Sequence, residues 1–332
     1  MQQAATHETA MQQTTLGRTG LRVSRIAFGT WQLGGDWGPT DEEAAIAAIR
    51  RAADQGVTLF DTAQAYGFGA SERLLAKALD GRNRDGLVIA TKGGLRPVGD
   101  GVARDASPEW IRRGVAESLD ALRTDAIDLY QVHWPDPKVP LEETAGALAD
   151  LVAEGKIRHV GISNFDVEQM EAFSSVLPVE TLQPAYHLFR REIEKEILPY
   201  AASRNIGVLV YGPLAHGLLG GHLRPETTFT PSDWRHASPV FSGESYRRNL
   251  DAVTALGLFA REELGTSVSG VALAWVLAQP AVQVAIVGTR DPSHVDDALA
   301  AAQLHLDEDA LARIDAIMAN SVPVDGPAPE TV

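Results

Sequence analysis

Short apolar segments alternate with longer amphipathic segments along almost the whole of this chain of 332 residues. The apolar segments have the length and the β-branched residues of strands, and the segments between them are long enough for helices. Strands and helices in such alternation form either a closed parallel barrel or an open doubly wound sheet. Eight pairs favour the barrel, a (β/α)8 TIM barrel of the α/β class. We expect its strands at Ile26–Gly29, Thr58–Asp61, Leu87–Thr91, Ile127–His133, His159–Ser163, Thr181–Gln183, Gly207–Tyr211 and Val284–Val287.

Two helix starts can be predicted from local sequence. Thr40 followed by Glu43 has the residues and spacing of a capping box. Ser107 followed by Pro108 combines a capping hydroxyl with proline at the first helical position.

No linker rich in proline, glycine or serine divides the chain, so we expect a single (β/α)8 domain at residues 14–320. We assign residues 1–13 to a disordered tail and residues 321–332 to a C-terminal tail. A β-hairpin within Thr15–Ser24 should precede the first strand, where it could close the N-terminal mouth of the barrel. The sequence also predicts an extra C-terminal helix at Asp307–Ala319. Residues 212–244 form a long loop after the seventh strand, and such loops are usually functional.

Composition excludes several classes of protein. The chain has no cysteine, which excludes disulfides and cysteine metal sites, and it contains no His-x-His or HExxH pattern, so we expect no metal. The net charge of −15 should repel nucleic acid and anionic lipid. The most apolar stretch, Gly270–Gly288, is interrupted by polar residues and proline, so no membrane span is expected. The polar N-terminus does not resemble a signal peptide, and translation could start at Met11; we expect a cytoplasmic protein.

Four side chains of chemical interest follow three neighbouring strands. In a (β/α)8 barrel the active site lies at the C-terminal ends of the strands. Asp61 ends the second strand, with Tyr66 in the loop behind it, while Lys92 and His133 end the third and fourth strands. One mouth of the barrel should therefore carry a carboxylate, a phenol, an amine and an imidazole.

These four groups suit the protonation of an oxygen on which negative charge develops. A tyrosine phenol titrates near pH 10, and a neighbouring ammonium stabilises the phenolate and so makes the phenol a better acid. Asp61 can hold Lys92 by an ion pair. His133 can donate a hydrogen bond to a substrate carbonyl and orient it. Tyr66 is therefore our candidate proton donor.

The motifs that contain these residues identify a family. The segments FDTAQAYGFGASE, ATKGG and DLYQVHWPD resemble the catalytic tetrad of the aldo-keto reductases, here Asp61, Tyr66, Lys92 and His133. Further similar segments are LGRTGLRVSRIAFGTW, KIRHVGISNF, VLVYGPLAHGLLGG and AIVGTRDP. The resemblance covers Thr15–Asn320 and is closer to the bacterial branch that also resembles potassium-channel β subunits. It implies the reversible reduction of an aldehyde or ketone by NADPH, with Tyr66 as general acid.

The resemblance also implies roles for many other residues. Ser163, Asn164 and Gln183 would bind the nicotinamide carboxamide, and Tyr211 would stack on the nicotinamide ring. The other implied cofactor contacts are Thr30, Trp31, Asp61, Gly212, Leu214, Gly217, Gly288, Thr289, Arg290, His294 and Asp297. The substrate pocket would comprise Trp31, Tyr66, His133 and Trp134. The aromatic residues expected in loops at this mouth favour an apolar or ring-shaped substrate; they are Trp31, Trp37, Phe68 and Trp134.

The segment expected to hold the adenosine phosphate departs from the family pattern. Arg290 favours NADPH because a guanidinium suits a phosphate. His294 stands where the family often has a basic or amide residue, and His222 stands where lysine is common. Asp291 adds negative charge, and Asp297 replaces a glutamate. NADPH remains the favoured cofactor, with NADH as the alternative.

Two other functions are compatible with parts of the sequence. A Schiff-base aldolase would also use a barrel lysine such as Lys92, but it needs a neutral amine, and Asp61 would keep Lys92 charged. A cofactor-sensing regulatory subunit of a membrane channel is permitted by the family resemblance. The complete set of four residues favours catalysis on a small carbonyl compound. The sequence does not indicate an oligomeric state.

Overall fold

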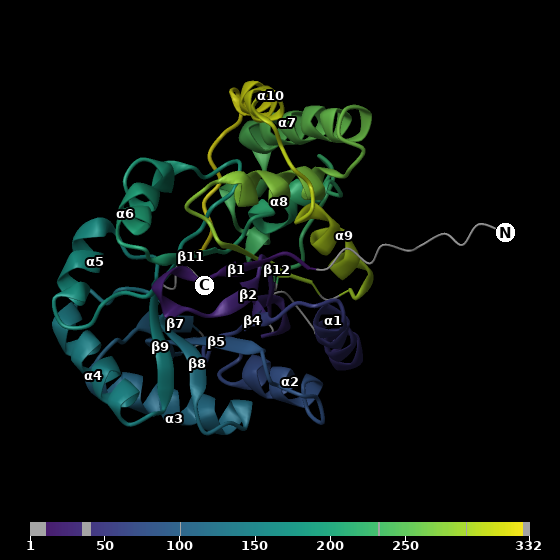
Figure 1. Ribbon diagram of the computed structural model, residues 1–332. Helices are drawn as coiled ribbons and strands as arrows, with labels where there is room; N and C mark the ends of the chain where they lie inside the picture. The colour runs from purple at the N-terminus through teal and green to yellow at the C-terminus, as the bar shows by residue number, and fades with distance from the viewer. Residues whose placement is uncertain (1–10, 35–40, 100, 232, 290, 328–332) are drawn as a thin grey trace.

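The computed structural model describes residues 11–34, 41–99, 101–231, 233–289 and 291–327, which form a closed parallel barrel surrounded by helices (Figure 1). The barrel closes between its last and first strands, where Ala285 pairs with Ile26 and Gly288 pairs with Gly29. The predicted barrel is confirmed, and each predicted strand lies within two residues of an observed one. The barrel strands are β3 (Ile26–Gly29), β4 (Leu59–Asp61), β5 (Val88–Gly93), β8 (Ile127–Val132), β9 (Ile157–Ser163), β10 (Thr181–Gln183), β11 (Gly207–Val210) and β12 (Val284–Gly288).

The helices that follow the strands cover the outside of the barrel. Ser107 caps α3, where its hydroxyl accepts a hydrogen bond from the Trp110 N–H, as its sequence predicts. The cap of α1 is Asp41, whose carboxylate accepts hydrogen bonds from two backbone N–H groups. The prediction of a cap at Thr40 was therefore wrong by one residue. Thr40 itself lies outside the described residues. The covering helices are α1 (Glu42–Asp54), α2 (Ala70–Ala78), α3 (Pro108–Leu122), α4 (Leu141–Ala153), α5 (Val167–Ser174), α6 (Ile197–Ser203), α8 (Val268–Ala278) and α9 (Ser293–Ala301).

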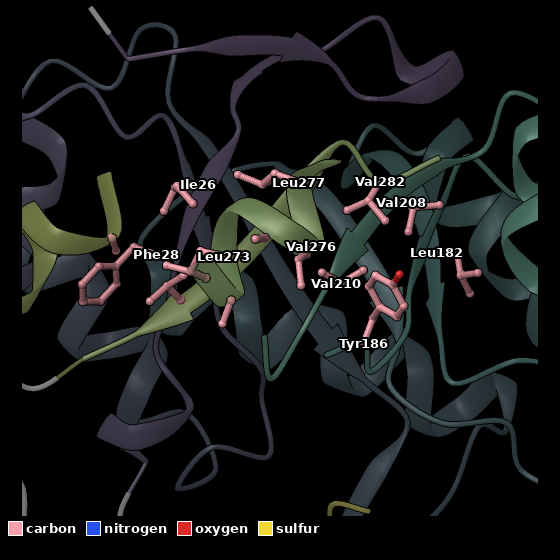
Figure 2. Close-up of a cluster of buried hydrophobic side chains, with 14 of the residues drawn as sticks. Ile26, Phe28, Leu182, Tyr186, Val208, Val210, Leu273, Val276, Leu277 and Val282 are labelled. Atoms are coloured by element: carbon pink, nitrogen blue, oxygen red, sulfur yellow. The ribbon is translucent and has the colours of Figure 1, made fainter. Parts of the chain in front are cut away.

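Helix α8 is buried on all sides because it packs between the barrel and a further helix, α7 (Gly243–Glu262). Figure 2 shows its side chains Leu273, Val276 and Leu277 among residues of β3, β10 and β11. This position explains why the sequence of α8 has no polar face. The predicted C-terminal helix is α10 (Glu308–Met318), which lies beside α7 (Figure 1). Among the described residues, no helix is both long and apolar enough to cross a membrane.

The predicted N-terminal hairpin closes the bottom of the barrel. It consists of β1 (Gln13–Thr15) and β2 (Arg22–Ser24), so it begins two residues before the predicted start, inside the segment assigned to a disordered tail. Leu16 and Val23 are fully buried in one cluster with inward-facing strand residues such as Leu59 and Leu129. Gly17, with φ of 51°, approaches the Gly207 backbone so closely that a Cβ atom would clash with it. The opposite mouth is thereby left as the open end.

Two features at that open end were not predicted. A second hairpin, β6 (Leu95–Val98) and β7 (Gly101–Arg104), follows β5. Residues 321–327, assigned to a C-terminal tail, are docked on the barrel: Val324 is fully buried and its N–H donates to the Phe189 carbonyl at 3.1 Å. The Asn249 side chain bonds both backbone groups of Val322, at 2.7 and 3.0 Å. Both features therefore help to shape the mouth where the candidate site lies.

Candidate active site

A buried ion pair joins the ends of β4 and β5. Lys92 Nζ lies 2.6 Å from Asp61 Oδ1, and the two residues are only 1% and 3% exposed. Lys92 also donates to the Thr62 carbonyl at 3.0 Å. The second carboxylate oxygen of Asp61 accepts hydrogen bonds from Gln183 Nε2 at 2.8 Å and Gln131 Nε2 at 3.3 Å. Buried charges are tolerated when they are paired and hydrogen-bonded in this way.

Tyr66 is held over this ion pair by a tight turn. Its hydroxyl lies 3.3 Å from Lys92 Nζ, so the ammonium donates to the phenol oxygen. The turn that follows has left-handed φ angles at three successive residues, 64° at Gly67, 43° at Phe68 and 91° at Gly69. Glycine adopts this conformation without steric cost, and two of the three positions carry it. The turn therefore fixes the position of the phenol.

His133 stands beside the phenol, just past the end of β8. Its ring meets the Tyr66 ring edge-on, with 5.7 Å between centroids. Burial and the charge of Lys92 hold the pKa of His133 well below its usual value, so the imidazole is neutral near pH 7. Its Nδ1 atom is buried and has no hydrogen-bond partner among the described residues. A neutral imidazole can donate one hydrogen bond to a substrate oxygen without carrying charge.

A hydrogen-bonded row follows the ends of β9, β10 and β11. Ser163 Oγ donates to the Gln183 carbonyl at 2.7 Å, and Asn164 Nδ2 donates to Ser163 Oγ at 3.0 Å. The Tyr211 hydroxyl donates to Asn164 Oδ1 at 2.8 Å. Burial raises the pKa of Tyr211 to about 12, so this phenol keeps its proton. The row thus presents fixed amide groups and an aromatic ring beside the ion pair.

These groups line one large cavity of about 710 Å³ at the open mouth of the barrel. Four of the predicted site residues do not line the cavity: Thr30, Lys92, Thr289 and Asp297. Lys92 lies behind Tyr66, Thr289 supports the loop after β12, and Asp297 faces solvent. Arg290 falls outside the described residues. The predicted site residues that do line the cavity are Trp31, Asp61, Tyr66, His133, Trp134, Ser163, Asn164, Gln183, Tyr211, Gly212, Leu214, Gly217, Gly288 and His294.

Several lining residues were missed from the sequence. Arg235 enters from the long loop, ion-paired with Asp233 at 2.6 Å and donating to the His216 carbonyl at 3.0 Å. Pro327 comes from the docked C-terminal segment, and Val102 from the second hairpin. The length of the loop was a signal for Arg235, whereas no local pattern marks Pro327 or Val102.

Aromatic residues of the same loop pack with one another. Phe229 and Trp234 lie 5.4 and 5.8 Å from Phe241, measured between ring centroids, and Trp234 lies 4.9 Å from His216. This cluster anchors the loop at the rim of the cavity.

A closed (β/α)8 barrel with acid–base side chains gathered at the carboxyl ends of its strands defines a barrel enzyme. The chain belongs to the Aldo/keto reductase family, whose model matches residues 25–319. Members of this family are NAD(P)H-dependent oxidoreductases, and this protein is accordingly one.

Individual relatives match nearly the whole chain. Aldo-keto reductase YhdN of Bacillus subtilis is 46% identical over 288 residues, which cover 86% of this chain and 87% of YhdN. The structure of glycerol dehydrogenase AKR11B4 from Gluconobacter oxydans has a TM-score of 0.85 at 39% identity and covers 97% of this chain and 98% of its own. An aldo/keto reductase from Klebsiella pneumoniae in complex with NADP and acetate has a TM-score of 0.72 at 29% identity, covering 96% and 99%.

Proposed function

We propose that this protein reduces an aldehyde or ketone with NADPH, and oxidises the corresponding alcohol in reverse, with Tyr66 as the proton donor and acceptor. One observation carries the proposal: the Tyr66 hydroxyl lies 3.3 Å from Lys92 Nζ, and Lys92 is itself held by Asp61 at 2.6 Å. A fixed ammonium at this distance stabilises the phenolate left after proton transfer.

The cavity fits the cofactor that this reaction requires. Bound NADPH supplies the hydride. The amide groups of Asn164 and Gln183 would hold the nicotinamide carboxamide, and the Tyr211 ring would stack on the nicotinamide. The backbone of Gly212–Gly217 offers N–H groups for the pyrophosphate, and the segment after Gly288 would hold the adenosine phosphate. The size of the cavity supports an extended ligand.

Each of the four candidate catalytic side chains has a separate role in protonating the carbonyl oxygen. His133, neutral because of its lowered pKa, donates a hydrogen bond that orients the oxygen toward Tyr66. Tyr66 passes its proton to the oxygen, and Lys92 stabilises the resulting phenolate. Asp61 keeps Lys92 charged and in position. The same ion pair argues against a Schiff-base aldolase, because that mechanism needs a neutral amine.

The substrate end of the cavity favours a small carbonyl compound with an apolar part. Trp31 stacks near Tyr66 with 6.4 Å between ring centroids, and Phe68 and Trp134 also line this end. The similar structure from Gluconobacter oxydans is a glycerol dehydrogenase, so small polyols and their oxidised forms belong among the compounds to be tested.

The proposal is tested by following NADPH oxidation at 340 nm with a panel of aldehydes, ketones and hydroxy-carbonyl compounds. We expect turnover with at least one class, and one alcohol formed for each NADPH consumed. Absence of turnover with every compound, in either direction, would contradict the proposed reaction. Trapping of a carbonyl compound on Lys92 by borohydride would instead support the aldolase.

A further inference from the structure

Two histidines lie face to face on the wall of the cavity, away from the four candidate catalytic residues. His222 belongs to the long loop after β11, and His294 belongs to the first turn of α9. Their ring centroids are 6.3 Å apart with 22° between the planes. Both side chains line the cavity and both residues are exposed, so each imidazole can exchange protons with solvent.

The structure orients the His294 ring toward this shared position. Its Nδ1 atom lies 3.4 Å from Thr289 Oγ1, and Thr289 is 8% exposed. Thr289 Oγ1 is fixed in turn, because it accepts from the Asp291 N–H at 3.0 Å and donates to the Asp291 carbonyl at 3.1 Å. His294 is therefore a positioned side chain directly after the segment that would receive the adenosine phosphate.

We propose that His222 and His294 form a protonation-dependent clamp for the 2′-phosphate of the cofactor, so that the preference for NADPH over NADH depends on pH. This inference rests on the proposed function, which seats the cofactor along the cavity. Imidazolium groups donate charge-assisted hydrogen bonds to phosphate, and these are stronger than bonds from a neutral ring. Histidine is the side chain that changes charge between about pH 5 and 8.

A carboxylate, Asp291, lies close to the pair. Hydrogen bonds from Ser293 hold the pKa of Asp291 low, so this carboxylate stays anionic next to His294. This carboxylate repels a phosphate, so binding there depends on positive charge from neighbouring groups.

Among the described residues, the charged side chains near the two histidines in the sequence have other partners or are exposed. Asp296 on α9 is paired with Arg51 of α1 at 2.8 Å. Arg224 bonds the carbonyls of Gly221 and Leu223, beside His222, at 3.0 and 2.9 Å. Asp297 lies exposed on α9.

The direction of the pH effect follows from the charges of the 2′-phosphate and of the histidine side chains. A phosphate monoester loses its second proton near pH 6, so it is a dianion throughout the range above about pH 6.5. Histidine side chains in general change charge between about pH 5 and 8, and so in part over the same range. NADP⁺ affinity should therefore fall as the pH rises from about 6.5 to 8.5, by roughly tenfold for the loss of charge-assisted bonds. NAD⁺ affinity should not change.

Isothermal titration calorimetry of the full-length protein tests this inference without turnover. The ligands are NADP⁺, NAD⁺, 2′,5′-ADP and 5′-AMP, each at about pH 6.5, 7.5 and 8.5. We expect only the two ligands with a 2′-phosphate to lose affinity. A ratio of NAD⁺ to NADP⁺ dissociation constants that is independent of pH overturns the inference. If NADP⁺ and NAD⁺ both fail to bind at every pH, the proposed function itself fails.

Three variants separate the clamp from general effects of charge. The double variant His222→Gln, His294→Gln should bind NADP⁺ weakly at every pH and keep the NAD⁺ affinity, which also reports that it is folded. His222→Lys should bind NADP⁺ tightly at about pH 8.5 and show a flatter profile. His305→Gln changes an exposed histidine outside the cavity and should match the parent protein. A steep pH profile that survives in the double variant would also overturn the inference.

Discussion

The Nζ atom of Lys92 lies 3.3 Å from the phenol oxygen of Tyr66, and this contact depends on an ion pair that is almost completely shielded from water. A buried ammonium is costly unless a carboxylate compensates it. Asp61 does so, and both of its oxygens are engaged, one by Lys92 and the other by Gln183 and Gln131. The stability of the barrel mouth and the proposed chemistry at Tyr66 thus depend on the same group.

Replacement of Lys92 should therefore affect both properties. Lys92→Met removes the ammonium and leaves Asp61 as an uncompensated buried charge, so we expect a loss of about 3–5 kcal/mol in the free energy of unfolding. Turnover should also fall steeply. The double variant Asp61→Asn, Lys92→Met should recover most of the stability and none of the activity. Urea denaturation and NADPH oxidation measure the two effects, and an equally unstable double variant would contradict this account of the ion pair.

Stability should fall as the solution becomes acidic. Burial lowers the pKa values of His133 and His187 well below the usual range, and that of His216 to about 4. Below about pH 6.5 these histidines are protonated in the unfolded chain but remain neutral in the folded protein, so the free energy of unfolding decreases with decreasing pH. For His216 alone the loss at pH 5 should be about 2 kcal/mol.

The histidine prediction is checked by urea unfolding at about pH 7 and pH 5. His216→Gln should lose part of the pH dependence, whereas His305→Gln, at an exposed position, should keep all of it. Identical pH dependence in all three proteins would contradict the assignment to His216.

The docking of residues 321–327 should depend on Asn249, which holds Val322 through two hydrogen bonds. Asn249→Ala removes both bonds, and Pro327, farther along the same segment, lines the cavity. We expect faster proteolysis near the C-terminus and a KM for the carbonyl substrate that is raised roughly fivefold, by about 1 kcal/mol. Asn83→Ala, on the surface, is the matched control. An unchanged proteolysis rate would show that other contacts hold the segment.

Gly93 should tolerate no side chain, chiefly because the Tyr130 hydroxyl lies directly against it. A Cβ atom at Gly93 would collide with the Tyr130 hydroxyl, which is buried and has no hydrogen-bond partner among the described residues. We expect Gly93→Ala to lose about 1–3 kcal/mol of stability through overpacking. Tyr130→Phe alone should be close to neutral, and it should partly rescue Gly93→Ala. Thermal denaturation of the three variants measures this, and absence of rescue would place the clash elsewhere.

The sequence allowed the barrel and the four strand-end residues to be predicted because both depend on local, repeated patterns. Buried parallel strands are continuous apolar runs, and each run ends where the polar residue begins, as at Asp61 and Lys92. The cap of α1 shifted from Thr40 to Asp41 because both residue types can cap, and local sequence does not distinguish them.

Tertiary contacts decide the features that could not be predicted. The β6–β7 hairpin has strands of four residues, one of them interrupted by Pro97, and the Leu95 carbonyl is held by the Trp110 indole at 3.0 Å. The segment up to Pro327 is docked through Val324, one apolar residue without a periodic pattern. The contact between the His222 and His294 rings depends on the course of the long loop, which local sequence does not determine.

The central claim is that Tyr66 supplies the proton, and single-turnover reduction by Tyr66→Phe tests it most directly. Cofactor dissociation constants are measured on the same samples, and Tyr200→Phe, at a half-buried position on α6 outside the cavity, serves as the matched control. We predict unchanged cofactor binding and a rate of reduction lowered by roughly 10²–10⁴-fold. A Tyr66→Phe protein that reduces the carbonyl at nearly the parent rate would show that the proton comes from another group.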